Sequence, residues 1–164
     1  PLWAQELYGF RDHVPEAEEY GVSSFVYRAR APFHPARVHA ALNGALPGVI
    51  RAKGHFWIAT RPDWVAEFSL AGAVSSVTPL GRWWAGVPRD RWPGDPDSRE
   101  RMAENWREPW GDRRQELVFI GAGLDRAAIT ARLDAALLTD REFTPEAWRG
   151  LPDPFPAWGA AQAA

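Results

Sequence analysis

The sequence GDRRQELVFIGAGLDRAAITARLDAALL, residues 111–138, contains a polar segment, an apolar segment and an amphipathic segment in succession. Its apolar residues Leu117 to Ile120 predict a buried β-strand over residues 116–122. Asp125 is a residue type that caps helix N-termini, and the apolar residues after it recur at three- and four-residue intervals. We therefore expect a helix directly after the strand, with one apolar face formed by Ala128, Ile129, Leu133, Ala136 and Leu137.

A similar strand and helix occur near the start of the chain. Residues 22–33 are rich in β-branched and aromatic residues and alternate in polarity, which predicts a strand. Pro35 follows His34 and favours the first position of a helix, because its missing N–H would have no partner there. The helix is expected to end at Asn43-Gly44, a pair typical of helix termination.

Two more strands and a short helix are predicted between these two units. Residues 49–60 and residues 64–84 are each expected to be extended, and the turn signal Pro62-Asp63 makes them antiparallel. Asp97-Ser98 predicts the start of a short helix that ends before Pro109.

The resulting order β-α-β-β-α-β-α predicts an α+β fold of the ferredoxin-like βαββαβ type. We expect a four-stranded, mainly antiparallel sheet with helices on one face, while the other face is open to solvent, to a partner or to residues 1–15. Residues 1–20 are interpreted as a linker or lead-in and residues 21–143 as the domain. Residues 144–164 are interpreted as a Pro/Ala-rich tail, and we expect its segment LPDPFPAWGAAQAA, residues 151–164, to be poorly packed.

Composition excludes several classes of protein. The 164 residues carry a formal net charge of −2, which disfavours non-specific binding to nucleic acid or to anionic membranes. The absence of cysteine excludes disulfides and thiolate metal sites, and no apolar run approaches the ~18 residues of a membrane span. The chain starts at Pro1 without a methionine, so we expect it to be a cytoplasmic part of a longer protein.

The sequence carries no motif for nucleotide hydrolysis or nucleophilic catalysis. Lys53 is the sole lysine and stands in RAKGHF, without the glycines and hydroxyl residue of a phosphate-binding loop. Residues 121–125, GAGLD, lack the full glycine pattern of a dinucleotide loop, and no G-x-S-x-G motif occurs. We therefore predict no catalytic residues and no cofactor-binding residues in this chain.

Two binding functions stay open as alternatives. The first is a metal site that combines His34 and His55 with a carboxylate, although a structural role is favoured for each histidine. The second is a free-standing ferredoxin-like RNA or ligand binder, because such sheets bind single strands through exposed aromatic residues. Residues 51–60, RAKGHFWIAT, are the nearest match to the required basic and aromatic run, and the match is imperfect.

Residues 82–116 are unusually rich in charge and tryptophan. They contain eight arginines, eight acidic residues and five of the ten tryptophans of the chain. The favoured interpretation is a solvated helix and loops whose tryptophans pack on the sheet. The alternative is a protein–protein surface, since tryptophan and arginine are enriched at binding hot spots.

Several ordered motifs over residues 16–143 resemble the C-terminal domain of the CobW family of P-loop GTPases. They are EEYGVSSFVYRARAPFHP, RAKGHFWIATRPD, GRWW and WGDRRQELVFIGAGLDRAAITARLDAALLTDREF. The resemblance implies a parent protein whose N-terminal GTPase domain carries a Walker motif and a C-x-C-C metal site. This chain has neither motif, so it is similar only to the domain that follows them.

The resemblance implies an accessory role in a GTP-dependent metallochaperone linked to cobalamin synthesis or zinc homeostasis. The expected partners are the protein's own GTPase domain and a client metalloprotein. GTP with magnesium, and zinc or cobalt, are implied only for the parent protein. Within the matching motifs, the candidate interface or structural polar residues are Arg51, Lys53, His55, Arg113, Arg114 and Gln115.

Overall fold

A computed structural model of the chain describes residues 21–159. The strands are β1 (Val22–Ala29), β2 (Val49–Phe56), β3 (Trp64–Ala71), β4 (Val74–Arg82) and β5 (Gln115–Ala122). The helices are α2 (Pro35–Asn43), α3 (Pro96–Asn105), α4 (Arg126–Ala136) and α5 (Pro145–Trp148), with short 3₁₀ turns at Trp84–Gly86, Arg89–Arg91 and Asp140–Glu142. Within this part of the chain, no helix is long and apolar enough to cross a membrane.

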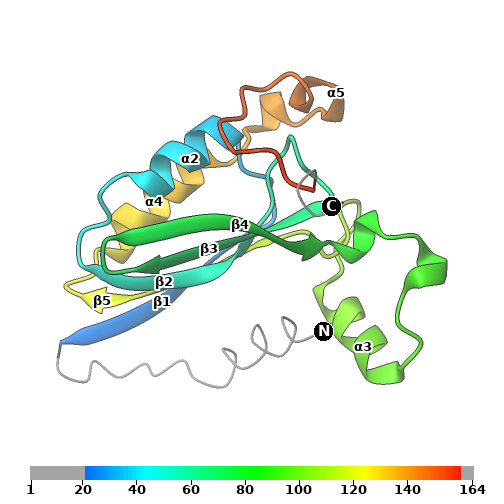
Figure 1. The fold of residues 1–164 in the computed structure, drawn as a ribbon, viewed down its shortest axis with the longest axis horizontal. Helices are drawn as coiled ribbons and strands as arrows, with labels where there is room; N and C mark the ends of the chain where they lie inside the picture. Colours follow the sequence, from blue (N-terminus) through cyan, green and yellow to red (C-terminus); the bar gives the residue numbers. More distant parts are fainter. Residues whose placement is uncertain (1–20, 160–164) are drawn as a thin grey trace.

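The strands form one antiparallel sheet in the order β1-β5-β2-β3-β4 (Figure 1). The α+β class with a mainly antiparallel sheet is confirmed, but the sheet has five strands, not four. The predicted strand over residues 64–84 is a hairpin, because the chain reverses at Gly72-Ala73 between the paired residues Ala71 and Val74. Gly72 has a φ of +60°, a conformation that glycine adopts without steric cost.

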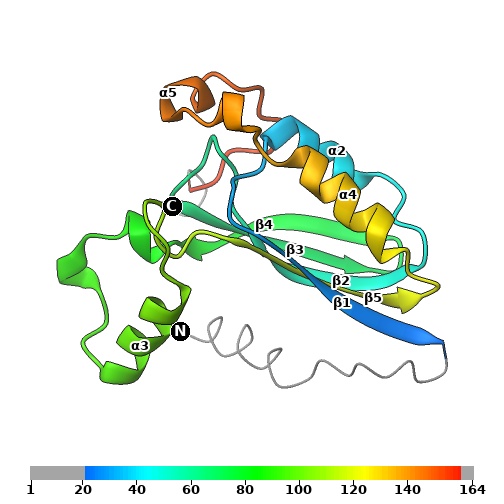
Figure 2. The same cartoon turned by 180° about the vertical axis from the view of Figure 1, so that it is seen from behind.

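Helices α2 and α4 lie side by side over one face of the sheet (Figures 1 and 2). Both begin as predicted. His34 Nδ1 accepts a hydrogen bond from the Arg37 N–H at 3.4 Å, and Asp125 Oδ1 accepts one from the Ala128 N–H at 3.0 Å. These caps satisfy backbone donors that have no partner inside the helix. The start of α3 was predicted two residues late, because Asp95 is its cap and Pro96 its first residue.

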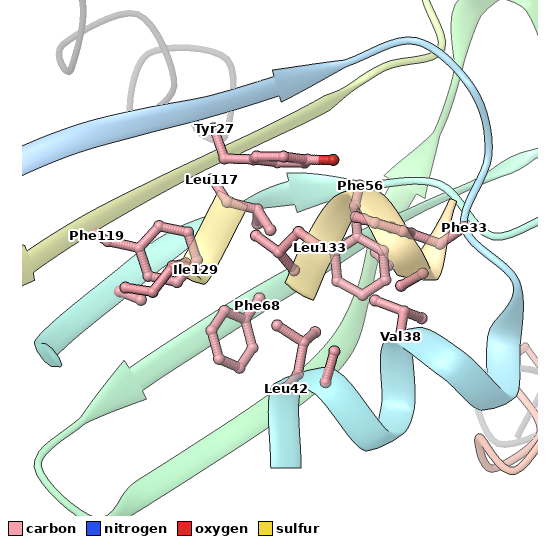
Figure 3. Packing of buried hydrophobic residues seen from close by; sticks show 14 of the residues in the cluster. Tyr27, Phe33, Val38, Leu42, Phe56, Phe68, Leu117, Phe119, Ile129 and Leu133 are labelled. Carbon is pink, nitrogen blue, oxygen red and sulfur yellow. The ribbon is translucent and has the colours of Figure 1, made fainter. Parts of the chain in front are cut away.

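The main hydrophobic core fills the space between the sheet and these two helices (Figure 3). Phe119 of β5 stacks on Phe25 of β1, with ring centroids 5.2 Å apart. Phe68 of β3 and Leu133 of α4 are also fully buried in this core. Each such side chain contributes about 1.5–3 kcal/mol by leaving water, so this layer holds the sheet and helices together.

A second core forms where residues 83–114 extend from one end of the sheet (Figure 1). Trp57, Trp83 and Trp148 are buried there, and Trp110 packs against them. The Trp110 and Trp148 rings are 5.0 Å apart, and the Trp57 and Trp148 rings are 6.0 Å apart. Trp83 and Trp110 therefore pack internally, as the favoured interpretation of residues 82–116 expects.

The Pro-rich tail is packed over residues 151–158, contrary to expectation. Arg61 Nε and Nη2 donate to the two carboxylate oxygens of Asp153 at 2.9 and 3.0 Å. Phe155 is buried in the main core, and the Arg61 guanidinium lies 4.3 Å from the Trp158 ring centroid. The proposed lead-in, residues 1–20, lies outside the described residues, as does the expectation that residues 1–15 cover the sheet.

The outer strand β4 has an irregular edge. Its register with β3 shifts between Val65 and Ala66, opposite Gly81 and Pro79. Pro79 has no N–H with which to extend a hydrogen-bond ladder. Two features that interrupt regular strand pairing thus lie at one edge of the sheet.

Candidate functional site

The polar residues before β5 surround the point where the loops of residues 83–114 rejoin the sheet. Asp112 begins this segment and is buried. Its Oδ2 and Oδ1 atoms accept hydrogen bonds from the N–H groups of Trp84 and Ala85, each at 3.0 Å. Asp112 therefore fixes the first turn that follows β4, and its role is to position backbone.

Arg113 connects the loop before β5 to the turn between β2 and β3. Its Nε donates to the Pro62 carbonyl at 2.6 Å, its Nη1 to the Trp110 carbonyl at 3.1 Å, and its Nη2 to Asp63 Oδ1 at 3.1 Å. The side chain is 11% exposed. Charge-assisted hydrogen bonds of this kind are stronger than neutral ones, so the guanidinium is engaged inside the protein.

Gln115 is buried and bonds to the backbone of two other chain segments. Its Oε1 accepts a hydrogen bond from the Trp57 N–H at 2.7 Å. Its Nε2 donates to the carbonyls of Ala31 and Trp57 at 2.8 and 3.1 Å. These groups lie just beyond the ends of β1 and β2, so the amide replaces the strand pairing that stops there.

Arg114 and Glu116 point away from the core, between β1 and β2. Arg114 Nε lies 3.4 Å from Glu116 Oε2, and Arg28 Nε lies 3.9 Å from the same oxygen. Arg114 Nη1 also donates to the Asp112 carbonyl at 2.9 Å. Antiparallel pairing creates this group, because Arg28 is directly opposite Glu116 in the β1–β5 register.

A pocket of about 260 Å³ opens at this group, between the end of β1, the start of β5 and the end of α3. Three guanidinium groups and one carboxylate line it, a net charge of +2. Burial lowers the pKa of Arg30, and the neighbouring positive charges of Arg114 and Arg107 lower it further. The lining residues are Arg28, Ala29, Arg30, Asn105, Arg114, Gln115 and Glu116.

The candidates on β2 share the sheet face that is turned away from α2 and α4. Arg51, Lys53 and His55 alternate along β2 with Ala52 and Phe56, which are buried in the core, and side chains on a strand alternate between its faces. Arg51 is exposed and Lys53 is half-buried. His55 is buried, and its ring centroid is 5.6 Å from that of Trp83. His55 pairs with Glu116 across β2 and β5 and thus lies beside the pocket group.

The structure does not assemble the alternative metal site. Within residues 21–159, no three histidine, aspartate or glutamate side chains are grouped so that they could hold a metal ion. His34 is half-buried and caps α2. Burial lowers the pKa of His34, and the neighbouring Arg37 charge lowers it further.

Sequence reasoning found Arg114 and Gln115 but missed the four other polar residues that line the pocket. Arg28 and Arg30 follow one another at a spacing of two at the end of a predicted strand, and Glu116 begins another predicted strand. That spacing is a signal for a charged sheet face, but only the strand register shows that Arg28 and Glu116 meet. Asn105, at the end of α3, had no signal.

Comparison with known proteins identifies the family to which the chain belongs. The model of the cobalamin synthesis protein CobW C-terminal domain matches residues 22–137. A Dictyostelium discoideum protein named zinc-regulated GTPase metalloprotein activator 1 is 39% identical over 161 residues, which cover 94% of this chain and 33% of that protein. A Mycobacterium tuberculosis protein named as a zinc chaperone is 36% identical over 146 residues, which cover 88% of this chain and 37% of that protein.

A solved structure shares the fold. The crystal structure of the Zn(II)-bound YjiA GTPase from E. coli matches with a TM-score of 0.50 and 20% identity, over 72% of this chain and 30% of that one. The chain thus spans about one third of the length of the proteins that it matches. Because the family model covers most of the residues that the structure describes, the chain belongs to the CobW C-terminal domain family.

Proposed function

We propose that this chain is the accessory C-terminal domain of a CobW-like, GTP-dependent metallochaperone and acts through protein–protein contact. The observation that carries the proposal is the family match over residues 22–137. The relatives named as a zinc-regulated GTPase metalloprotein activator and a zinc chaperone support it, because each is about three times as long as the matched region. The partner is the protein's own GTPase domain or a client metalloprotein in the cytoplasm.

Some of the candidate polar residues bond within this chain and others are exposed, which supports a role in protein–protein contact. Arg113 and Gln115 direct their hydrogen bonds to backbone and side-chain groups of this chain. Arg51 is exposed on the sheet face opposite the helices, and Arg28 is exposed at the rim of the pocket. In this proposal, Arg113 and Gln115 are structural, whereas Arg51 and Arg28 face the partner. GTP, magnesium and the transported zinc or cobalt are bound by the rest of the parent protein.

The proposal is tested with the isolated 164-residue chain and the GTPase portion that we expect to be encoded upstream in the same reading frame. Isothermal titration calorimetry should detect binding between the two pieces, and a fluorescent GTP analogue should bind only the GTPase portion. The Arg51→Glu variant should weaken the complex, whereas Arg149→Glu, at the exposed arginine that directly follows α5, should not. GTP hydrolysis or tight GTP binding by the isolated chain would refute the proposal, as would a gene that encodes no GTPase.

A further inference from the structure

The pocket between β1, β5 and α3 has an excess of positive charge that its own residues do not neutralise. Glu116 is the sole carboxylate among the seven lining residues and stands against Arg28, Arg30 and Arg114. Its Oε2 lies 3.4 Å from Arg114 and 3.9 Å from Arg28, so one acidic oxygen serves two guanidinium groups. The remaining charge of +2 would attract an anionic ligand.

The three arginines differ in how firmly they are held. Arg114 is 13% exposed and bonds through Nε and Nη1 to Glu116 and to the Asp112 carbonyl. Arg30 donates one hydrogen bond, from Nη1 to the Asn105 carbonyl at 2.8 Å. Arg28 is 62% exposed, and its contact with Glu116 is long. Arg114 is therefore held in place at the base of the pocket. Arg28 and Arg30 lie at its rim and keep guanidinium N–H groups available for a ligand.

The pocket suits a group the size of an amino-acid side chain. Its volume of about 260 Å³ lies below the range of about 300–1,000 Å³ that is typical of small-molecule sites. Gln115 adds no free donor, since its amide already bonds to Trp57 and Ala31. Recognition thus rests on guanidinium groups, whose planar donors match carboxylates in pairs.

We propose that this pocket binds the carboxylate side chains of an acidic segment on a partner protein, with Arg28 and Arg30 closing over a carboxylate above Arg114. The inference rests on the proposed function, because it names the chemistry of the partner surface. The negative charge of Glu116 offsets the charge of one arginine. Glu116 therefore weakens the attraction of the pocket for any anion.

The test uses the full 164-residue chain and a fluorescein-labelled hexaglutamate peptide, with binding followed by fluorescence anisotropy at low salt. Arg28→Ala should weaken binding by about three- to tenfold, in the range of one lost charge-assisted hydrogen bond at a partly exposed site. Glu116→Gln should strengthen binding by a similar factor, because it removes the opposing charge. Arg149→Ala should leave binding unchanged, and thermal melts of all variants should show that each is folded.

Opposite effects of the two pocket variants distinguish the site from general attraction to a positive surface. Equal binding by Arg28→Ala, Glu116→Gln and Arg149→Ala would overturn the inference, as would the absence of peptide binding. Displacement of the peptide by inorganic phosphate at lower concentration than by glutarate would assign the pocket to phosphate and also overturn it. Peptide binding by a chain that also hydrolyses GTP or binds it tightly would refute the proposed function alone. Binding of the GTPase portion without peptide binding would refute only the carboxylate assignment.

Discussion

Neighbouring residues of the segment Asp112–Glu116 perform different tasks, because successive side chains of a strand point to opposite faces. Gln115 points inward with Leu117 and supplies hydrogen bonds to backbone that has left the sheet. Arg114 and Glu116 point outward into the pocket. A change of one residue in register would exchange these roles, so the β1–β5 and β2–β5 pairings determine which polar groups can meet a ligand.

Gln115→Leu should lower the free energy of unfolding by about 2–4 kcal/mol, since each buried group left without a hydrogen bond costs about 1–3 kcal/mol. Three backbone groups, on Trp57 and Ala31, would lose their partner. Urea unfolding monitored by circular dichroism measures the effect. Arg51→Ala, at an exposed position, should change stability by less than about 0.5 kcal/mol. A similarly small effect of Gln115→Leu would show that the amide is dispensable.

At the level of the elements, the close approach of β2 and β5 places the pocket beside His55. A Cβ atom added to Gly54 would lie 2.1 Å from the Glu116 carbonyl oxygen and 2.8 Å from the Leu117 Cα. Both contacts are with backbone, so no side-chain rotation relieves them. Glycine at this position therefore allows β5 to pair with β2 in the register that sets Glu116 beside His55.

Gly54→Ala should destabilise the domain by at least the ~1–3 kcal/mol typical of overpacking, because the two strands must move apart. Gly94→Ala is the matched control, since a Cβ there meets no atom within 4 Å and Gly94 has no strained φ. Thermal melts compare the two variants, and amide exchange of β2 and β5 should accelerate only in Gly54→Ala. Equal melting temperatures would show that the strands tolerate the added methyl group.

At the level of the whole molecule, features fixed by local sequence were predictable, whereas features fixed by distant contacts were not. The Pro35 and Asp125 helix starts follow from the residues at each terminus. The hairpin at Gly72 was missed, because Gly-Ala is a weak turn signal inside an extended apolar segment. Arg61 and Asp153 are 92 positions apart in the sequence, so no local sequence pattern predicts their contact. The pocket depends likewise on the register between separate strands.

The anchored tail should make the stability of the whole domain depend on acid pH through Asp153. Burial raises the pKa of this carboxyl, but the hydrogen bonds from Arg61 and Thr60 outweigh burial and leave the pKa below its usual value. The stabilisation is therefore complete above the unfolded-state pKa, 3.8, and is lost as pH falls through the folded-state value.

Asp153→Asn should consequently be less stable than the parent chain at pH 7, and the difference should shrink as the pH falls below about 4. Thermal melts across this pH range provide the measurement, and limited proteolysis should cut residues 151–158 faster in the variant. Asp97→Asn serves as the control, at an exposed aspartate on α3. A stability difference that does not vary with pH would mean that the Asp153 charge contributes nothing to the anchor.

The irregular outer edge at β4 affects how this domain can associate. A regular exposed strand offers unpaired N–H and C=O groups that template a further strand, in aggregates as well as in peptide complexes. Pro79 and the register shift beside it interrupt that template in the middle of β4. Sheets of two molecules are therefore disfavoured from joining edge to edge here, which keeps the domain from polymerising on its β4 side.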